Sequence, residues 1–198
     1  MRNFFYFFLF SNLILCQAPN DFYKIIDSIN AERLKNDVST LVNFGTRHSL
    51  SDTISNYRGI GAARRWIKSE FDLISKQCDN CLEVFYQKNY FTKKDSERII
   101  HPVWVNNVVA IQKGLKYPNR YIIMSGDIDS RISDPLNYIN DSPGANDNAS
   151  GMAGTIEVAR VLTKYKFNNS IVYLGLSGEE QGLMGGKGFA AFAKKNNW

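Results

Sequence analysis

The chain has 198 residues, of which 44% are hydrophobic, 13% aromatic and 22% charged, and its formal net charge is +5. This composition suits one folded domain with a hydrophobic core and excludes an intrinsically disordered chain. The positive charge is mild and spread along the chain without a basic block, so we expect no nucleic acid partner.

The N-terminus has the layout of a secretory signal peptide. Arg2 precedes a nearly continuous apolar run from Phe4 to Cys16, which is shorter than the roughly 20 residues of a membrane-spanning helix but fits the core of a signal. We therefore expect a signal peptide at residues 1–18, a mature domain at 19–198 and a secreted or exported protein without a membrane span after signal removal. The alternative is that the apolar run is a buried strand or helix. The cleavage site and lipidation of Cys16 stay open.

The first half of the mature chain predicts two helices and then two strands. Apolar residues at near-helical spacing predict helices at 21–41 and 60–75. Runs rich in β-branched and aromatic residues predict strands at 82–90 and 103–112. Between them, Cys78 and Cys81 form an isolated C-x-x-C motif. In an oxidising compartment this motif favours a local disulfide over a zinc site or a redox centre.

The second half predicts alternating strands and helices. The expected elements are a short buried strand at 120–125, a long loop to Asn148, a helix at 149–165, a strand at 170–176 and a helix at 183–195. This order predicts an α/β domain with a largely parallel sheet. Ligands of such sheets bind outside the carboxyl ends of the strands. The loops after residues 125 and 176 are therefore the candidate functional loops.

Both candidate loops are acidic. Asp127 and Asp129 open the first loop, Asp147 lies where it closes, and Glu179 and Glu180 follow the second strand. Unpaired carboxylates at one sheet edge would repel one another, and bound cations would remove that penalty. The pattern indicates a metal site. Taken singly, each motif also fits a solvated charge pair, a turn or a helix N-cap.

Three segments, MSGDIDSR, SPGANDNASG and LGLSGEEQGLMGG, resemble the motifs of the M28 family of zinc aminopeptidases. The similarity extends from about Asn43 to the C-terminus. It implies a zinc exopeptidase-like α/β fold, a three-layer sandwich with a mixed, largely parallel sheet. It also implies a metallo-exopeptidase that hydrolyses N-terminal peptide bonds of peptides or proteins with water activated by two zinc ions.

The resemblance also implies roles for individual carboxylates. Asp147 matches the ligand that bridges two metals, Glu180 a ligand of one metal, and Glu179 the general base. Asp127 stands where the family has a His ligand, so we expect a metal ligand here that loosens selectivity toward Mn, Mg or Ca. Asp129 matches the Asp that orients that His. Without the imidazole, we expect Asp129 to pair with Arg131 or to join the metal.

The family takes a further acidic ligand and a final His from segments after the E-E motif. Between the E-E motif and Trp198 the sequence contains no acidic residue and no histidine. The two histidines of the chain, His48 and His101, lie upstream of every motif. We expect both histidines to be ordinary loop or strand residues and the chain to be a C-terminally truncated peptidase domain. Two alternatives remain: a non-catalytic metal- or peptide-binding module on a peptidase scaffold, and a glutaminyl-cyclase-like enzyme.

Overall fold

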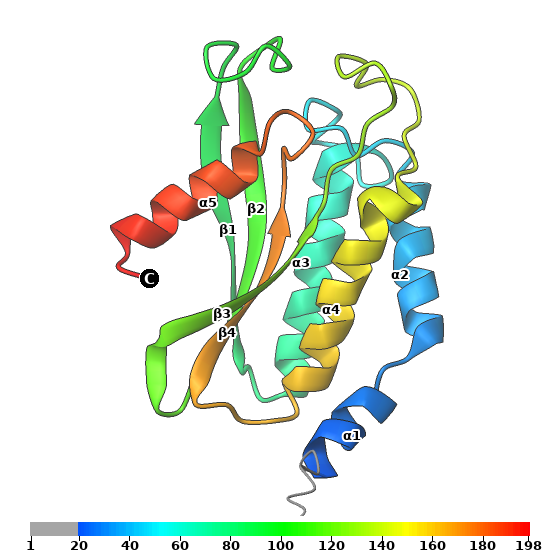
Figure 1. Cartoon of the computed structure of the whole chain (residues 1–198). Helices are drawn as coiled ribbons and strands as arrows, with labels where there is room; N and C mark the ends of the chain where they lie inside the picture. The colour runs from blue at the N-terminus through cyan, green and yellow to red at the C-terminus, as the bar shows by residue number, and fades with distance from the viewer. Residues whose placement is uncertain (1–19) are drawn as a thin grey trace, which may run out of the picture.

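A computed structural model of the chain describes residues 20–198. The predicted signal peptide lies outside these residues. The elements follow in the order α1 (Asn20–Asp27), α2 (Ala31–Asn43), α3 (Gly59–Gln77), β1 (Leu82–Phe91), β2 (Val103–Gln112), β3 (Tyr117–Asp127), a short kinked helical segment η1 (Ala145–Ala149), α4 (Ser150–Leu162), β4 (Asn169–Leu176) and α5 (Met184–Lys195) (Figure 1).

The N-terminal region differs from its prediction. One continuous helix was expected at 21–41, but the structure has two, α1 and α2. Asn30 is the N-cap of α2, and its side chain accepts a hydrogen bond from the backbone N–H of Arg33 at 3.0 Å. Asn is favoured at a helix start, where its side chain pairs with a free N–H group, and it is disfavoured inside a helix. The capping bond of Asn30 therefore starts a new helix within the segment that the apolar pattern predicts as one.

The sheet is mixed, with strand order β1-β2-β4-β3. β1 pairs antiparallel with β2, β2 pairs antiparallel with β4, and only β3 and β4 are parallel. The expected mixed sheet is therefore confirmed, but the expectation of largely parallel strands is wrong for the described residues. The reason is connectivity: β1 returns through a hairpin loop to β2, whereas α4 lies between β3 and β4 along the chain and provides the crossover that parallel strands need.

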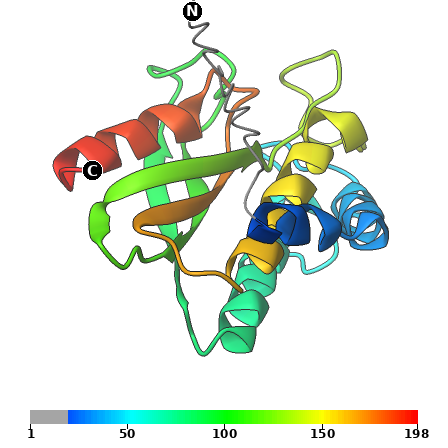
Figure 2. The same cartoon turned by 60° about the horizontal axis from the view of Figure 1, so that its bottom comes forward.

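Side-chain alternation along β2 divides the core into two layers. Val108 and Ala110 pack with α3 and α4 on one face of the sheet. Val109 and Ile111 pack on the other face against Phe189 of α5. Figure 2 shows the sheet between α5 on one side and the remaining helices on the other. This arrangement confirms the three-layer sandwich, because successive residues of a strand point to opposite faces.

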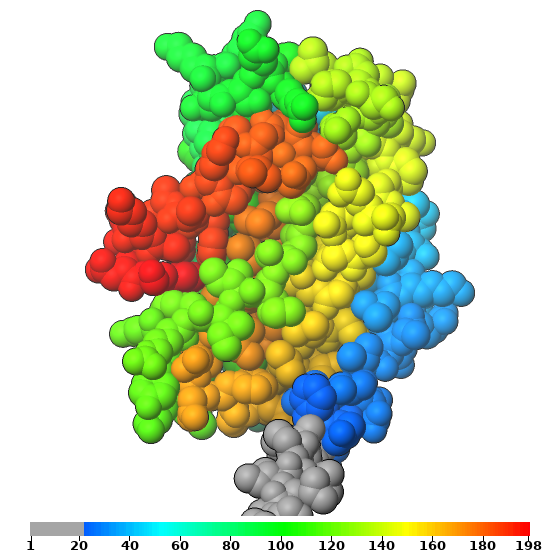
Figure 3. Space-filling model, viewed as in Figure 1, coloured from blue at the N-terminus to red at the C-terminus, as the bar shows by residue number. Residues whose placement is uncertain are grey.

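β3 is longer and more exposed than predicted. The sequence RYIIMS was expected to be a short buried strand, but Ile122 is 52% exposed, Ile123 48% and Met124 39%. In Figure 3 this strand, in light green, crosses the visible face between α5 and α4. The prediction that this strand is buried is wrong because β3 is the last strand in the order and pairs only with β4 within residues 20–198. An apolar run predicts a strand but not what covers it.

The C-x-x-C motif forms the predicted local disulfide, Cys78–Cys81. It lies where α3 ends and β1 begins, next to a pair of hydrogen bonds between the Ser75 hydroxyl and the backbone of Leu82. The bond therefore closes the turn that carries the chain from helix to sheet. Among the described residues, no helix is long and apolar enough to cross a membrane.

Candidate metal centre

Three loops bring their carboxylates to one edge of the parallel β3–β4 pair. Asp127 ends β3 and lies in register with Leu176 at the end of β4. Asp147 lies in the kinked segment before α4, and Glu179 and Glu180 follow β4. Parallel strands end at the same edge, which is why residues far apart in sequence converge here.

The pKa values of these carboxylates reflect their crowding. Burial raises the pKa of Asp127, and the charges of Asp147 and Glu180 raise it further. Burial also raises the pKa of Glu179, followed by the charges of Glu180, Asp127 and Asp147. Both effects disfavour the ionised form. The structure thus brings together the four carboxylates singled out from the sequence, while their individual roles stay predictions.

Close backbone approach allows Asp147 to reach this edge. Gly126 of β3 lies against the start of α4, where an added Cβ would be 2.5 Å from the backbone nitrogen of Met152. Gly144 precedes the kinked segment with a left-handed φ of 46°. A side chain at either glycine would push the loop and the strand apart. Gly144 therefore has a structural reason within the P-G-A-N-D-N-A-S-G sequence, and Gly126 has one in the strand that faces it.

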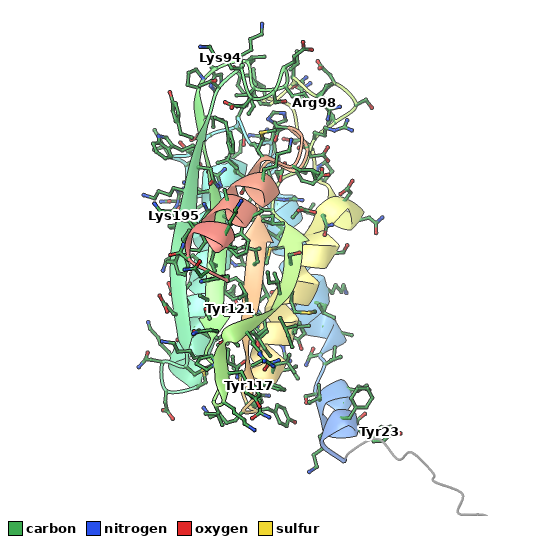
Figure 4. All side chains as sticks on the ribbon, turned by 60° about the vertical axis from the view of Figure 1, so that its left-hand side comes forward. Tyr23, Lys94, Arg98, Tyr117, Tyr121 and Lys195 are labelled. Atoms are coloured by element: carbon green, nitrogen blue, oxygen red, sulfur yellow. A yellow bond between two sulfur atoms is a disulfide. The ribbon has the colours of Figure 1, made fainter. Side chains whose placement is uncertain are left out.

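Glu180 has a cationic partner that the sequence analysis did not identify. Arg131 donates from Nε to Glu180 Oε2 in an ion pair. The backbone carbonyl of Glu180 also accepts from Arg98 Nη1 at 2.8 Å. Arg98 comes from the loop between β1 and β2, at the top of Figure 4. The Glu180 side chain is therefore held by a guanidinium.

Asp129 does not pair with Arg131, contrary to one of the two expectations. Its Oδ1 accepts from the backbone N–H of Glu179 at 3.2 Å, and its Oδ2 accepts from that of Glu180 at 3.1 Å. Burial raises its pKa to about 7, against the opposing effect of these two hydrogen bonds. Asp129 therefore orients the backbone that carries the two glutamates.

Arg47 is the main structural residue that the sequence analysis missed. It is fully buried, and its guanidinium donates to the carbonyls of Ile128 at 2.8 Å, Pro143 at 2.7 Å and Gly144 at 2.9 Å. Burial lowers its pKa to about 10, so it stays charged at neutral pH. It ties the loop after β3 to the loop before α4. No sequence signal marks it, because its partners are backbone carbonyls that any residue supplies.

His48 borders the carboxylate cluster, because its Nε2 lies 3.2 Å from Gln181 Nε2 and the charge of Glu180 acts on its ring. That neither histidine is a metal ligand stays a prediction. His48 is buried, and its Nδ1 accepts from the backbone N–H of Leu50 at 3.1 Å, while its Nε2 lies 3.0 Å from the carbonyl of Pro135. Burial lowers its pKa and favours the neutral ring. His101 is exposed and packs edge-on against Tyr138.

The cluster fits a divalent cation in chemistry but falls short in number of ligands. Carboxylate oxygens bind zinc as well as harder ions, and a cation would relieve the repulsion that raises these pKa values. Yet within residues 20–198 no group of three or more His, Cys, Asp or Glu is gathered closely enough to hold an ion. The four carboxylates therefore lie near one another without forming, among the described residues, a group that could hold an ion as arranged.

Sequence comparisons connect this arrangement to one family. A model of peptidase family M28 matches residues 107–198, the part of the chain that contains the four carboxylates. A probable zinc metalloprotease from Pyrenophora tritici-repentis is 39% identical over 170 residues. The chain belongs to peptidase family M28. The match to the Pyrenophora relative takes in 86% of this M28 chain but only 39% of the relative.

Solved structures share the fold of the M28 chain. The LapA aminopeptidase from Legionella pneumophila has a TM-score of 0.71 at 18% identity, over 100% of this chain and 47% of LapA. The glutaminyl cyclase from Fimbriiglobus ruber has a TM-score of 0.63 at 19% identity, over 86% of this chain and 57% of the cyclase. Identities this low establish the zinc exopeptidase-like fold and nothing about the reaction.

Proposed function

We propose that this protein is a metallo-exopeptidase, an aminopeptidase that hydrolyses the N-terminal peptide bonds of peptides or proteins. The observation that carries the proposal is the convergence of Asp127, Asp147, Glu179 and Glu180 at the carboxyl edge of β3 and β4. Carboxylates that raise one another's pKa in this way are concentrated at functional sites. Membership of family M28 supports a peptidase as the function of this site.

Asp127, Asp147 and Glu180 are the residues that would hold metal, with Asp147 shared between two ions. Zinc is the expected metal, and Mn, Mg or Ca remain open because Asp127 is a harder ligand than His. When bound, zinc supplies Lewis-acid chemistry that polarises a carbonyl and lowers the pKa of water.

Glu179 is the residue that would move protons. Its raised pKa brings the carboxylate closer to the range in which it can both take and give a proton near neutral pH. In this proposal Glu179 takes the proton of the attacking water and passes it to the leaving amine. Asp129 holds the Glu179 backbone through the hydrogen bond described above, which limits the positions that the Glu179 side chain can reach.

The test is aminoacyl-anilide hydrolysis by a protein that includes any coding sequence following Trp198. Activity should be lost with a chelator and restored by zinc. Glu179→Gln should lower kcat by about 10²–10⁴-fold while zinc binding is kept, because only the proton-transfer group is removed. Glu83→Gln, an exposed change on β1, is the control. Ordinary turnover in Glu179→Gln would disprove the base assignment.

Two other functions each have one observation in their favour. The Arg131–Glu180 ion pair occupies a proposed ligand, as a non-catalytic module would allow. Failure to bind zinc below millimolar concentrations in calorimetry would favour that module. A glutaminyl cyclase has the same fold, so ring closure of N-terminal glutamine is the other reaction to test. Formation of pyroglutamate from a glutaminyl peptide, without anilide hydrolysis, would establish that reaction.

We also propose that the protein is secreted or exported. The apolar N-terminal run behind Arg2 and the Cys78–Cys81 disulfide support this location, because disulfides persist in oxidising compartments. Mass spectrometry of the protein from the medium or cell envelope should show a new N-terminus near residue 19. An intact Met1 on all of the protein, found inside the cell, would contradict the proposal.

A further inference from the structure

A cavity of about 1000 Å³ is lined by residues of the first turns of α3, of the loop at residues 50–54 and of the β1–β2 hairpin. The course of these elements can be followed in Figure 1. None of the four clustered carboxylates lines the cavity. Its walls combine cationic, aromatic and amide side chains, among them Arg64, Tyr86, Lys88, Trp104, Asn106 and Tyr138. We call it the α3 cavity.

The charged groups of the α3 cavity are mostly positive. Arg64, Arg65 and Lys88 line it, and Asp52 is the only lining carboxylate. Arg65 already donates to the carbonyls of the 50–54 loop, including that of Thr53 at 2.8 Å. Asp52 in turn accepts from backbone N–H groups of its own turn. Lys88 is exposed and forms no ion pair within the described residues. Arg64 makes no ion pair either, but the charge of the buried Asp129 acts on it and opposes the fall in its pKa.

Arg64 is the unusual member of this set. It is only 4% exposed, and it donates from Nε to Ser177 Oγ at 3.3 Å and from Nη1 to the carbonyl of Trp104 at 3.4 Å. Its Nη2 is buried without a hydrogen-bond partner among the described residues. The Oδ1 of Asn106 is likewise buried and unpaired. Buried polar groups are nearly always hydrogen-bonded, so an unpaired guanidinium N–H beside a cavity points to a ligand.

The α3 cavity also has an apolar surface suited to a flat group. Tyr86 and Trp104 lie on neighbouring strands β1 and β2, and Tyr138 comes from the long loop after β3. Aromatic rings bind planar apolar groups through offset or edge-on packing. Burial lowers the pKa of Arg64 to about 10, which leaves the guanidinium charged at neutral pH. Charge and aromatic surface together define the chemistry of a ligand.

We propose that the α3 cavity binds a carboxylate attached to an aromatic or similarly flat apolar group. The carboxylate is held by the positive charges of Arg64 and Lys88, and the apolar group packs against Tyr86 and Trp104. A guanidinium and an ammonium are the usual protein partners of a carboxylate. None of the four clustered carboxylates lines this site, although Arg64 contacts Ser177, which directly precedes the loop that carries Glu179 and Glu180.

The test is a titration of the 198-residue chain with benzoate, followed by the indole N–H signal of Trp104 in a ¹H–¹⁵N NMR spectrum. Trp104→Phe identifies that signal, and Trp66 and Trp198 serve as internal references. Benzoate should shift the Trp104 signal saturably in the millimolar range, as expected for so small a ligand. Benzamide, which has the same shape without the charge, should bind about tenfold more weakly.

Substitutions then show which positively charged side chains bind benzoate. Arg64→Gln should weaken benzoate binding about tenfold, and Lys88→Gln about threefold because its charge is exposed. Lys195→Gln, which removes an exposed charge from α5 (Figure 4), is the matched control and should change nothing. If Arg64→Gln does not fold, the benzamide comparison and Lys88→Gln still decide. Equal binding of benzoate and benzamide, or no shift of Trp104 with either, would overturn the proposal.

Discussion

Two acidic regions of this molecule use the same side chains in opposite ways. In the helical layer, Arg160 of α4 contacts Asp37 of α2 at 2.5 Å and Glu70 of α3 at 2.6 Å. Glu157 is paired as well, and although burial opposes it, hydrogen bonds from Arg33 and a backbone N–H lower its pKa. At the sheet edge, by contrast, Glu180 is the one carboxylate of the four that forms an ion pair among the described residues, with Arg131. Asp127 and Glu179 have their pKa raised by burial and by the neighbouring carboxylates.

The carboxylates of the two regions have opposite effects on the stability of the folded state. A buried carboxylate with a guanidinium partner cross-links helices, and its ionised form is stabilised. A carboxylate among like charges destabilises the folded state until a cation arrives. The pKa of Glu157 is lowered whereas those of Asp127 and Glu179 are raised, and this difference supports the sheet edge as the proposed functional region.

The largest effect should come from breaking the paired region. Arg160→Met leaves Asp37 and Glu157 buried with fewer partners, and we expect the free energy of unfolding to fall by about 3–5 kcal/mol in urea denaturation. The control is Lys68→Met, which removes a half-exposed i,i+4 pair with Asp72 and should cost about 0.3–0.5 kcal/mol. Equal losses in the two variants would mean that the Arg160 network has no special role.

Zinc should stabilise the folded protein through the carboxylates of the sheet edge and not through those of the helical layer. Zinc at about 100 times its Kd should raise the free energy of unfolding by about 2.7 kcal/mol. Asp147→Asn should abolish this gain, because the shared ligand is lost. Asp79→Asn, an exposed change next to the disulfide, should keep it. Thermal unfolding with and without zinc measures both, and an undiminished gain in Asp147→Asn would disprove the bridging role.

The metal-free protein should become more stable as the pH falls from neutral. The pKa of Asp129 is about 7 in the folded state and has an ordinary value of 3.8. Between these values the folded state binds a proton that the unfolded chain releases, so stability rises on acidification by at most about 1.4 kcal/mol per pH unit. Asp129→Asn should flatten this part of the profile in chemical denaturation. Parallel curves for the two proteins would contradict the assignment.

The smallest effect concerns the competition for Glu180. Arg131→Gln frees the Glu180 carboxylate from its ion pair, so zinc should bind about threefold more tightly in calorimetry. The effect is modest because Arg131 is partly exposed and such pairs are weak. Arg120→Gln on β3, whose guanidinium lies over the Tyr117 ring, is the control. Weaker zinc binding in Arg131→Gln would show that the arginine supports the site instead of competing for it.

Periodicity predicted the elements well wherever local signals were strong. The helix expected at 60–75 and the strands expected at 82–90 and 103–112 match α3, β1 and β2 within a few residues. The same signals misjudged the break at Asn30 and the exposure of Ile122 and Ile123. The break depends on one capping hydrogen bond, and the exposure depends on the position of β3 in the sheet. Neither the capping hydrogen bond nor the position of β3 in the sheet alters the hydrophobic pattern of the sequence.

By itself, the sequence determined the α/β class, the local disulfide and the set of carboxylates that gather at the sheet edge, because short-range periodicity and motif order encode them. Only the tertiary structure decided that Arg131 pairs with Glu180, that Asp129 binds the backbone of the E-E pair, and that Arg47 joins two loops. These contacts join residues about 50 to 100 positions apart in the chain. Such partners are selected by the way the strands and helices pack, which no local pattern records.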